Sequence, residues 1–367
     1  MGLVGFIVGL VLILAILWDI FETVISPRRV TRRLKLTTLL YETAWFPSSR
    51  AARLIHHGQT REKFLSLFGP ISLILLLVVW ATVVIMGYAL VLWGSGAPLF
   101  MTNGQSQNFE SYFYLSGVTF FTLGYGDITP ATLVGRVFCL FATATGFGMF
   151  ALVISYLPVL YQSFSRRETS ISLLDARAGS PSSAVELLRR HHVSNSFEDL
   201  NRLLTEWERW SAELLESHLS YPVLCYFRSQ HDNQSWLRAL TTVLDTCAIV
   251  LSGVEGAPVW QARMTFAMAR HAVVDISQVL RTAPSRVSNE SDRLPPGEFT
   301  RAVDLLAQNG IRLASDTSSE ARLRELRGMY EPYVFALSNL LLMPLPPWIL
   351  PQDAIDNWKT SAWGRIQ

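Results

Sequence analysis

The sequence predicts an all-α membrane protein with three transmembrane helices, a short re-entrant helix and a helical cytoplasmic domain. Three apolar stretches lie in the first half of the 367-residue chain, and each is longer than the roughly 20 residues needed to cross a hydrocarbon core. Half of all residues are hydrophobic and the mean hydropathy is +0.27, which is unusual for a soluble protein. Charged residues return after residue 167, where apolar residues recur at helical spacing.

The first stretch predicts an N-terminal transmembrane helix at residues 1–26. It lacks a basic leading segment and a small-x-small cleavage site, so we expect a retained anchor and not a signal peptide. Asp19 and Glu22 lie near its inner end. Intramembrane acids can be functional, but the proximity of Arg28 and Arg29 favours pairing or snorkelling at the interface.

The basic linker at residues 27–63 sets the orientation. It contains nine basic residues, opposed by Glu42 and Glu62, whereas residues 94–108 contain no Lys or Arg. The positive-inside rule therefore predicts that the linker and the chain after Arg166 are cytoplasmic and that the N-terminus is outside. The linker is interpreted mainly as a topology signal, and binding to anionic lipid is the alternative.

Residues 64–165 predict one membrane module, with an outer helix at 64–93 and an inner helix at 133–165. Between them, residues 109–120 predict a short helix that Asn108 caps, with Glu110 in its first turn. This helix is too short to span the membrane and must re-enter from outside. The backbone that follows then lies at membrane depth, where irregular structure is tolerated only if it is buried in protein or lines a water-filled path.

The backbone at residues 122–127 has the composition that a path for a cation requires. Gly124 and Gly126 can adopt positive φ at little steric cost, so that successive carbonyl groups can point toward one axis. Such carbonyl groups replace the water shell of a cation, and several copies of the strand are needed to complete the ring. We expect Tyr125 to pack behind this backbone and Asp127 to tie its outer end to the surrounding helices. The expected cation-binding residues are Thr122, Leu123, Gly124, Tyr125 and Gly126, and the first four would hold the ion.

The segment Thr119-Phe120-Phe121-Thr122-Leu123-Gly124-Tyr125-Gly126-Asp127 resembles the pore loop of the potassium channel superfamily. The whole chain resembles the bacterial single-pore members with three transmembrane helices. Leu123 stands where Val or Ile is commoner, and Val118 stands where some relatives have Glu, which puts filter-based inactivation in doubt. The resemblance implies a pore helix at 109–120 and a selectivity filter at 122–127, with Thr119 and Asp127 as its support.

The resemblance also implies a function. It implies passive K⁺ conduction by a homotetramer in the cell membrane, with no cofactor besides the permeant ion. The helical domain at 166–367 is then expected to modulate gating or assembly, through a regulatory ligand that the sequence does not identify. No span carries the repeated basic residues of a voltage sensor, and no glycine-rich nucleotide-binding pattern follows a strand.

The inner helix contains two candidate gating residues, Gly146 and Pro158. Gly146 resembles the hinge glycine of the family, and Pro158 would remove a helix hydrogen bond toward the cytoplasm. Close helix packing at a small residue is the alternative for Gly146, and it is the favoured interpretation for Gly148.

The helical domain has no sequence feature of an enzyme. It has no nucleophile–base pair or phosphate-binding loop, and the net charge of +2 indicates no nucleic-acid partner. A cluster that includes His218, Tyr221, Arg228 and Asp232 predicts either a pocket or, as the favoured interpretation, a helix end with satisfied hydrogen bonds. The pairs His56-His57 and His191-His192 and the three cysteines have no metal-site spacing. We expect amphipathic helices at Ser182–His191, Ser196–Ser217, Gln234–Leu251, Ala257–Leu280, Gly297–Gln308 and Ser319–Leu340.

Two other functions remain as alternatives. A potassium transporter subunit would carry several degenerate pore loops in one chain, whereas this chain has one full copy. A receptor or enzyme with a vestigial pore would place its chemistry in the helical domain, where no catalytic pattern supports it.

Overall fold

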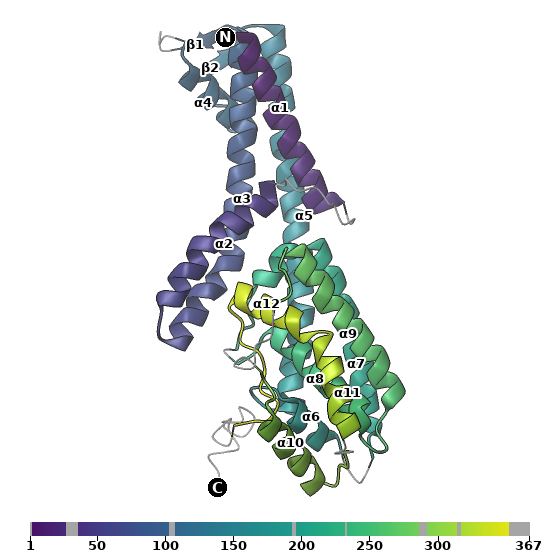
Figure 1. The fold of residues 1–367 in the computed structure, drawn as a ribbon. Helices are drawn as coiled ribbons and strands as arrows, with labels where there is room; N and C mark the ends of the chain where they lie inside the picture. The colour runs from purple at the N-terminus through teal and green to yellow at the C-terminus, as the bar shows by residue number, and fades with distance from the viewer. Residues whose placement is uncertain are drawn as a thin grey trace, which may run out of the picture. The chain divides into compact units, whose positions relative to one another are not determined.

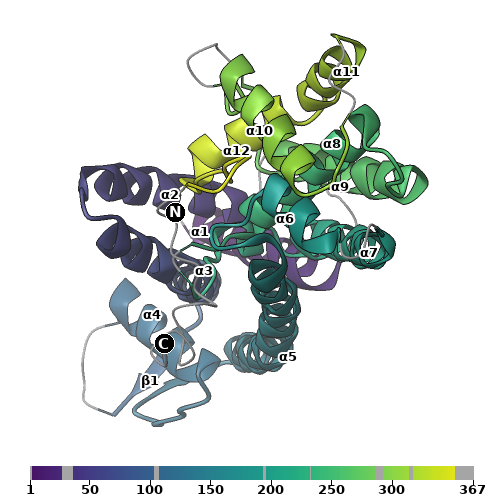
Figure 2. The same cartoon turned by 90° about the horizontal axis from the view of Figure 1, so that it is seen from below.

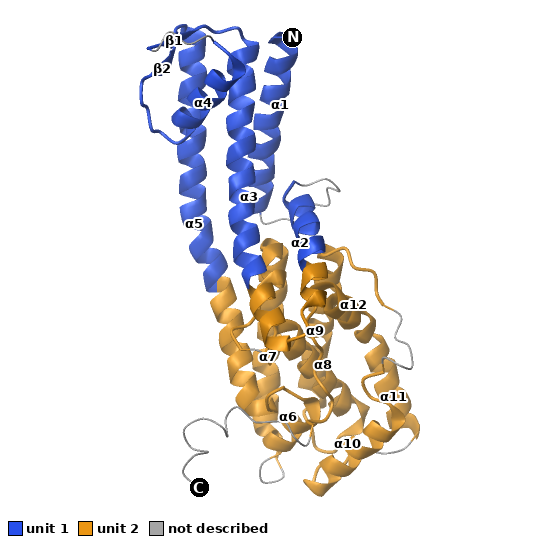
Figure 3. Ribbon diagram, turned by 90° about the vertical axis from the view of Figure 1, so that its left-hand side faces the viewer, with its two compact units in different colours: residues 1–48, 67–162 blue, residues 49–66, 163–367 orange. Residues whose placement is uncertain are grey.

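The computed structural model describes residues 2–26, 36–102, 107–192, 196–231, 233–285, 292–313 and 317–351. The chain forms two compact units, which Figure 3 distinguishes by colour. Unit 1 contains residues 1–48 and 67–162, and unit 2 contains residues 49–66 and 163–367. The division near residue 163 lies close to the expected boundary at 166, but part of the basic linker joins the helical domain.

Unit 1 is built on three long apolar helices. These are α1 (Gly2–Ile20), which ends in one π-helical turn at Phe21–Ile25, α3 (Gly58–Gly94) and α5 (Leu133–Ala178). Each is long and apolar enough to cross a membrane, as is a fourth helix, α8 (Trp236–Gly253), in unit 2. Because α8 is 83% buried inside the protein, its apolar character is also that of a core helix.

The basic linker contains a helix that the sequence analysis did not predict. This helix, α2, spans Leu36–Leu54. Thr37, Leu40, Tyr41 and Trp45 are buried on it at spacings of three and four residues, which is the pattern of one helix face. The many charged residues of the linker obscured this pattern in the sequence. Arg28 and Arg29, the expected partners of Asp19 and Glu22, lie outside the described residues.

Helices α1 and α3 approach each other closely at glycine. A Cβ atom on Gly9 would lie 2.5 Å from the carbonyl oxygen of Gly87, and a Cβ atom on Gly87 would lie 2.7 Å from Ile13. Both distances are shorter than van der Waals contact, so the crossing requires glycine on both helices. Small residues at such crossings are typical of helix packing in membranes.

Asp19 links α1 to two other helices. Its carboxylate accepts hydrogen bonds from the Thr37 hydroxyl at 2.7 Å and from the Trp80 indole at 2.8 Å. Asp19 is buried, and Glu22 accepts a hydrogen bond from the exposed Trp18 indole at 2.8 Å. The two acids therefore have different surroundings, and Asp19 has a structural role within unit 1.

One end of unit 1 contains the short helix α4 (Phe109–Phe120) and a small antiparallel sheet. Strand β1 (Leu99–Met101) precedes α4, and strand β2 (Ile128–Pro130) follows residues 121–127. The register pairs Leu99 with Pro130 and Met101 with Ile128. The sheet closes the loop that carries the predicted filter, and it is an addition to the all-α class that the sequence predicts.

Unit 2 gathers its helices around α8, as the two views in Figures 1 and 2 show. Helices α6 (Ala184–His191), α9 (Val259–Val279), α11 (Thr317–Gly328) and α12 (Glu331–Leu341) contact α8, and α7 (Glu198–Ser220) packs along α9. Helix α10 (Pro296–Gln308) contacts α6. A short 3₁₀-helix, η2 (Pro222–Tyr226), follows α7.

Two expectations for this unit were wrong. Helix α8 is not amphipathic, because it is buried on all sides from Trp236 to Val250. The hydroxyls of Thr241 and Thr246 donate to carbonyls within the helix, and the buried Asp245 carboxylate pairs with Arg293. The single helix expected at 319–340 is two helices, α11 and α12. Pro332 stands in the first turn of α12, where proline starts a helix but cannot continue one.

Replacement of Asp19 tests its structural role. In Asp19→Ala the Thr37 hydroxyl and the Trp80 indole stay buried without this acceptor, and each such loss costs about 1–3 kcal/mol. We expect a lower thermal unfolding midpoint for the purified protein in detergent. Glu22→Ala is the matched control, since it removes a carboxylate one turn later whose indole partner is exposed. Equal midpoints for the two variants would contradict the assignment.

Candidate functional site

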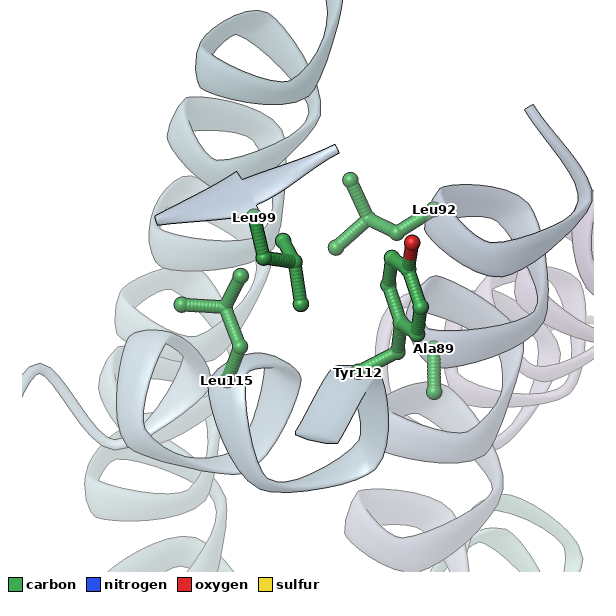
Figure 4. Packing of buried hydrophobic residues seen from close by; sticks show 5 residues of the cluster. All are labelled: Ala89, Leu92, Leu99, Tyr112 and Leu115. Carbon is green, nitrogen blue, oxygen red and sulfur yellow. The ribbon is translucent and has the colours of Figure 1, made fainter. Parts of the chain in front are cut away.

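Helix α4 is fixed at its start and along one face. The Asn108 side chain caps it by accepting hydrogen bonds from the Ser111 backbone N–H at 3.0 Å and from the Ser111 hydroxyl at 2.9 Å. The Tyr112 hydroxyl donates to the carbonyl of Ala97 at 2.9 Å. Tyr112 and Leu115 pack against side chains of α3 and β1, and Figure 4 shows the cluster of Ala89, Leu92, Leu99, Tyr112 and Leu115. The helix has the bounds that the sequence predicts.

The chain leaves α4 in a tight turn. The backbone N–H of Thr122 donates to the Thr119 carbonyl at 3.0 Å, and that of Leu123 donates to the Val118 carbonyl at 2.8 Å. Thr122 has a φ of +58°, which is rare and strained for a residue with a β-carbon. This strained position begins the predicted filter.

The sign of the backbone angle φ alternates along the predicted filter. The φ angle is +58° at Thr122, +59° at Gly124 and +78° at Gly126, whereas Leu123 and Tyr125 are not among the residues with positive φ. In a regular strand, successive peptide groups point to opposite sides. A positive φ at every second residue reverses the direction of every second peptide group. Successive carbonyl groups can then face the same side. Glycine provides it at two of the three positions.

The filter segment is exposed in the single chain. Residues 121–126 are all exposed, with 55% exposure at Leu123 and 69% at Tyr125. The packing expected behind Tyr125 is therefore not supplied by the chain itself. A Cβ atom on Gly124 or Gly126 would meet nothing within 4 Å. The backbone angle and not lack of space is thus the reason for glycine here.

Asp127 joins the C-terminal end of the predicted filter to its surroundings. Its carboxylate accepts a hydrogen bond from the Tyr114 hydroxyl of α4 at 2.9 Å. Its carbonyl accepts from the backbone N–H of Thr102 at 3.1 Å and from the Thr102 hydroxyl at 3.2 Å. The support of a filter by Asp127 stays a prediction, and nothing in the sequence relates Tyr114 or Thr102 to Asp127.

The N-terminal end of the predicted filter packs on α5. The Thr143 hydroxyl donates to the Thr119 carbonyl at 3.3 Å. A Cβ atom on Gly146 would lie 2.1 Å from the carbonyl oxygen of Phe120, so Gly146 is required for this contact. Gly148 has nothing within 4 Å of a Cβ atom, so the packing favoured for it is not formed within the chain. Helix α5 continues through Gly146 and Pro158 without interruption, and their roles in gating stay predictions.

The described residues of the polar cluster in the helical domain, His218 and Arg228 among them, make separate contacts. His218 is fully buried, and burial holds its pKa well below the ordinary value. Its Nδ1 lies 2.8 Å from the Leu214 carbonyl and therefore donates, so that Nε2 can accept from Arg167 at 3.2 Å. Arg228 is also buried and donates to main-chain carbonyls, and Asp232 lies outside the described residues. The contacts of His218 fit the interpretation as a helix end with satisfied hydrogen bonds. The Arg228 Nε departs from it, because this buried atom has no hydrogen-bond partner among the described residues.

A cavity of about 520 Å³ lies beside this cluster within unit 2. Its charged lining residues are Arg166 and Arg167 on α5 and Glu213 and Glu216 on α7, and Tyr221 is the member of the predicted cluster that lines it. The two positive and two negative side chains give the cavity no preferred sign. Within the described parts of the chain, no three His, Cys, Asp or Glu side chains gather as a metal site.

Comparison with known proteins agrees with the position of the site. Residues 71–162, which contain α4, the filter segment and most of α3 and α5, match the model of a family described as "Ion channel". The chain is also 23% identical, over 299 residues, to an uncharacterized membrane protein of Bacillus subtilis, YdjJ; the alignment covers 80% of this chain and 83% of that protein. No solved structure matches.

These similarities support a membrane protein of the ion channel type and do not specify the ion. Ion channels are not enzymes, so the family match agrees with the expectation that this chain is not an enzyme. The segment at residues 71–162 is thus similar in sequence to the ion channel family.

Proposed function

We propose that the chain is one subunit of a potassium-selective channel in which four copies surround a single pore. The observation that carries this proposal is the alternation of φ at Thr122, Gly124 and Gly126. A backbone of this kind can present a row of carbonyl oxygens on one side, and rings of such oxygens replace the hydration shell of K⁺. The order Thr-Leu-Gly-Tyr-Gly-Asp at 122–127 supports potassium as the ion.

The exposure of the filter segment supports the assembly. A single chain leaves residues 121–126 open to solvent, and exposed backbone of this kind is not tolerated in the hydrocarbon region. One strand also supplies only one side of a cation path. Four copies around an axis would give each carbonyl row three partners and would cover Tyr125 with neighbouring chains.

The proposed placement in the cell membrane follows from the distribution of charge. The three apolar helices α1, α3 and α5 would span the bilayer, with the sheet β1–β2 outside and unit 2 in the cytoplasm. The excess of Lys and Arg in residues 27–63 supports this orientation. The filter would then lie at the outer half of the pore, and α5 would lead from it toward the cytoplasmic domain.

Two glycines with similar backbone angles test the proposed filter. Gly124 (φ +59°) and Gly96 (φ +66°) both have open space around a Cβ atom, but Gly96 lies outside the filter. Alanine at either site costs about 1–2 kcal/mol of backbone strain. We expect Gly124→Ala to lower the ratio of K⁺ to Na⁺ flux in liposomes about tenfold or more, since 1.4 kcal/mol corresponds to a factor of ten. Gly96→Ala should keep the ratio of the unaltered protein. A Gly124→Ala protein with unchanged selectivity would contradict the proposal.

A second pair of glycines tests how the filter is seated on α5. Gly146→Ala forces a methyl group against the Phe120 carbonyl, and overpacking of this kind costs about 1–3 kcal/mol. We expect lower thermal stability and lower K⁺ flux. Gly148→Ala, two residues away with free space in the chain, should retain the stability of the unaltered protein. If both variants were equally stable, the contact at Gly146 would not position the pore helix.

A further inference from the structure

The cytoplasmic ends of α3 and α5 both bind one short segment of unit 2. This coupling segment comprises residues 222–228, that is, η2 and the two residues after it. Residues 58–66 of α3 and 163–178 of α5 belong to unit 2 together with the segment, as the orange parts of these helices in Figure 3 show. The contacts described below therefore lie within one compact unit.

Arg167 joins α5 to the coupling segment. Its guanidinium donates to the carbonyls of Leu224 and Phe227, each at 2.9 Å, and pairs with Glu168 at 2.9 Å. The side chain is 3% exposed, and the guanidinium carbon lies 5.1 Å from the centre of the Phe164 ring. The planar guanidinium holds five N–H donors in a fixed geometry, so that it can serve two carbonyls and a carboxylate that lie in different directions. Bonds of a charged, buried donor are among the stronger ones in proteins.

Arg228 joins the same segment to α3 and to α12. Its guanidinium lies 3.4 Å from the carboxylate of Glu62 on α3, and it donates to the carbonyls of Leu341 and Leu342 at the end of α12. The Arg228 side chain is 5% exposed and that of Glu62 is 20% exposed. A buried cation with one acidic partner is costly to leave unpaired, so Glu62 and Arg228 hold α3 and the segment together.

Side chains also fix the segment from within the domain. The Trp236 indole at the start of α8 donates to the Cys225 carbonyl at 3.2 Å, and Val223, Leu224 and Cys225 are almost fully buried. The segment is thus rigidly connected to the core of the domain and, through two arginines, to both helices that flank the filter in sequence. Helix α5 runs unbroken from Leu133 to Ala178, so a displacement at Arg167 is applied directly to the proposed inner helix.

We infer that the coupling segment transmits the state of the helical domain to the pore, with Arg167 and Arg228 as positioning residues that bind the inner and outer helices to it. This inference rests on the proposed channel function. It assigns to the domain a mechanical role in setting the open-to-closed ratio, separate from ion selectivity, which belongs to residues 122–127. Coupling of this kind between distant sites commonly changes an equilibrium 5- to 150-fold.

The test compares Arg167→Gln with Arg166→Gln in the full-length protein. Arg166 is the exposed neighbour on α5, so its replacement is the matched control for charge. Single-channel recordings in K⁺ should show an open-to-closed ratio changed about tenfold in Arg167→Gln, with an unchanged K⁺-to-Na⁺ permeability ratio. Hydrogen–deuterium exchange should become faster in residues 222–228 and also in residues 58–66 of α3. Arg166→Gln should match the unaltered protein in all three measurements.

The outcomes distinguish this inference from the proposed function. Faster exchange in residues 222–228 with an open-to-closed ratio within twofold of the unaltered protein would overturn the inference and leave the channel function intact. An unaltered protein that carries no K⁺ current would instead contradict the proposed function. In that case, unchanged hydrogen–deuterium exchange of residues 58–66 in Arg167→Gln would still refute the link between the helices. Glu62→Gln provides a second test if Arg167→Gln does not fold. Glu62→Gln removes the charge of the partly exposed partner of Arg228, and we expect it to change the open-to-closed ratio. An open-to-closed ratio equal to that of the unaltered protein would overturn the inference.

Discussion

The backbone from Thr122 to Gly126 needs support at both ends, and the rest of unit 1 provides this support. Its carbonyl groups form no ladder with a neighbouring strand, and three of its five residues have positive φ. Such a segment keeps one conformation only if both ends are fixed, because nothing along its length holds it. The turn at Val118–Leu123 and the seat on Gly146 fix one end, and Tyr114 and Thr102 fix the other through Asp127. The cluster around Tyr112 holds α4, which carries both fixed ends.

The same constraint separates selectivity from gating. The predicted filter contacts α4 and the middle of α5, whereas the last part of α5 belongs to unit 2. The contacts of Arg167 lie beyond the last residues of unit 1. In this account the helical domain has no part in recognising the ion. Its contribution is the position of two helix ends, which the coupling segment holds together.

The sequence predicts the parts of the site that depend on local chemistry. Asn108, Glu110 and the glycines at 124 and 126 act through their own backbone or the next turn, so the helix α4 and the positive φ angles at the two glycines could be predicted from the chain alone. The partners of Asp127 and the contact of Gly146 with Phe120 depend on how separate elements pack, which no local pattern records. The strained Thr122 was not foreseen, because threonine rarely adopts positive φ. Helix α2 was not predicted because its linker is strongly charged. The complete burial of α8 was not predicted because the helix has many hydroxyl groups, which donate hydrogen bonds within the helix.

The measurement that tests the central claim most directly is the reversal potential of the unaltered protein in a planar bilayer, with K⁺ on one side and Na⁺ on the other. A filter of aligned carbonyls predicts a strongly shifted reversal potential, corresponding to K⁺ permeability about tenfold or more above that of Na⁺. A reversal potential near zero would show that the pore does not distinguish the two ions. It would contradict the account in which the backbone at residues 122–126 selects potassium.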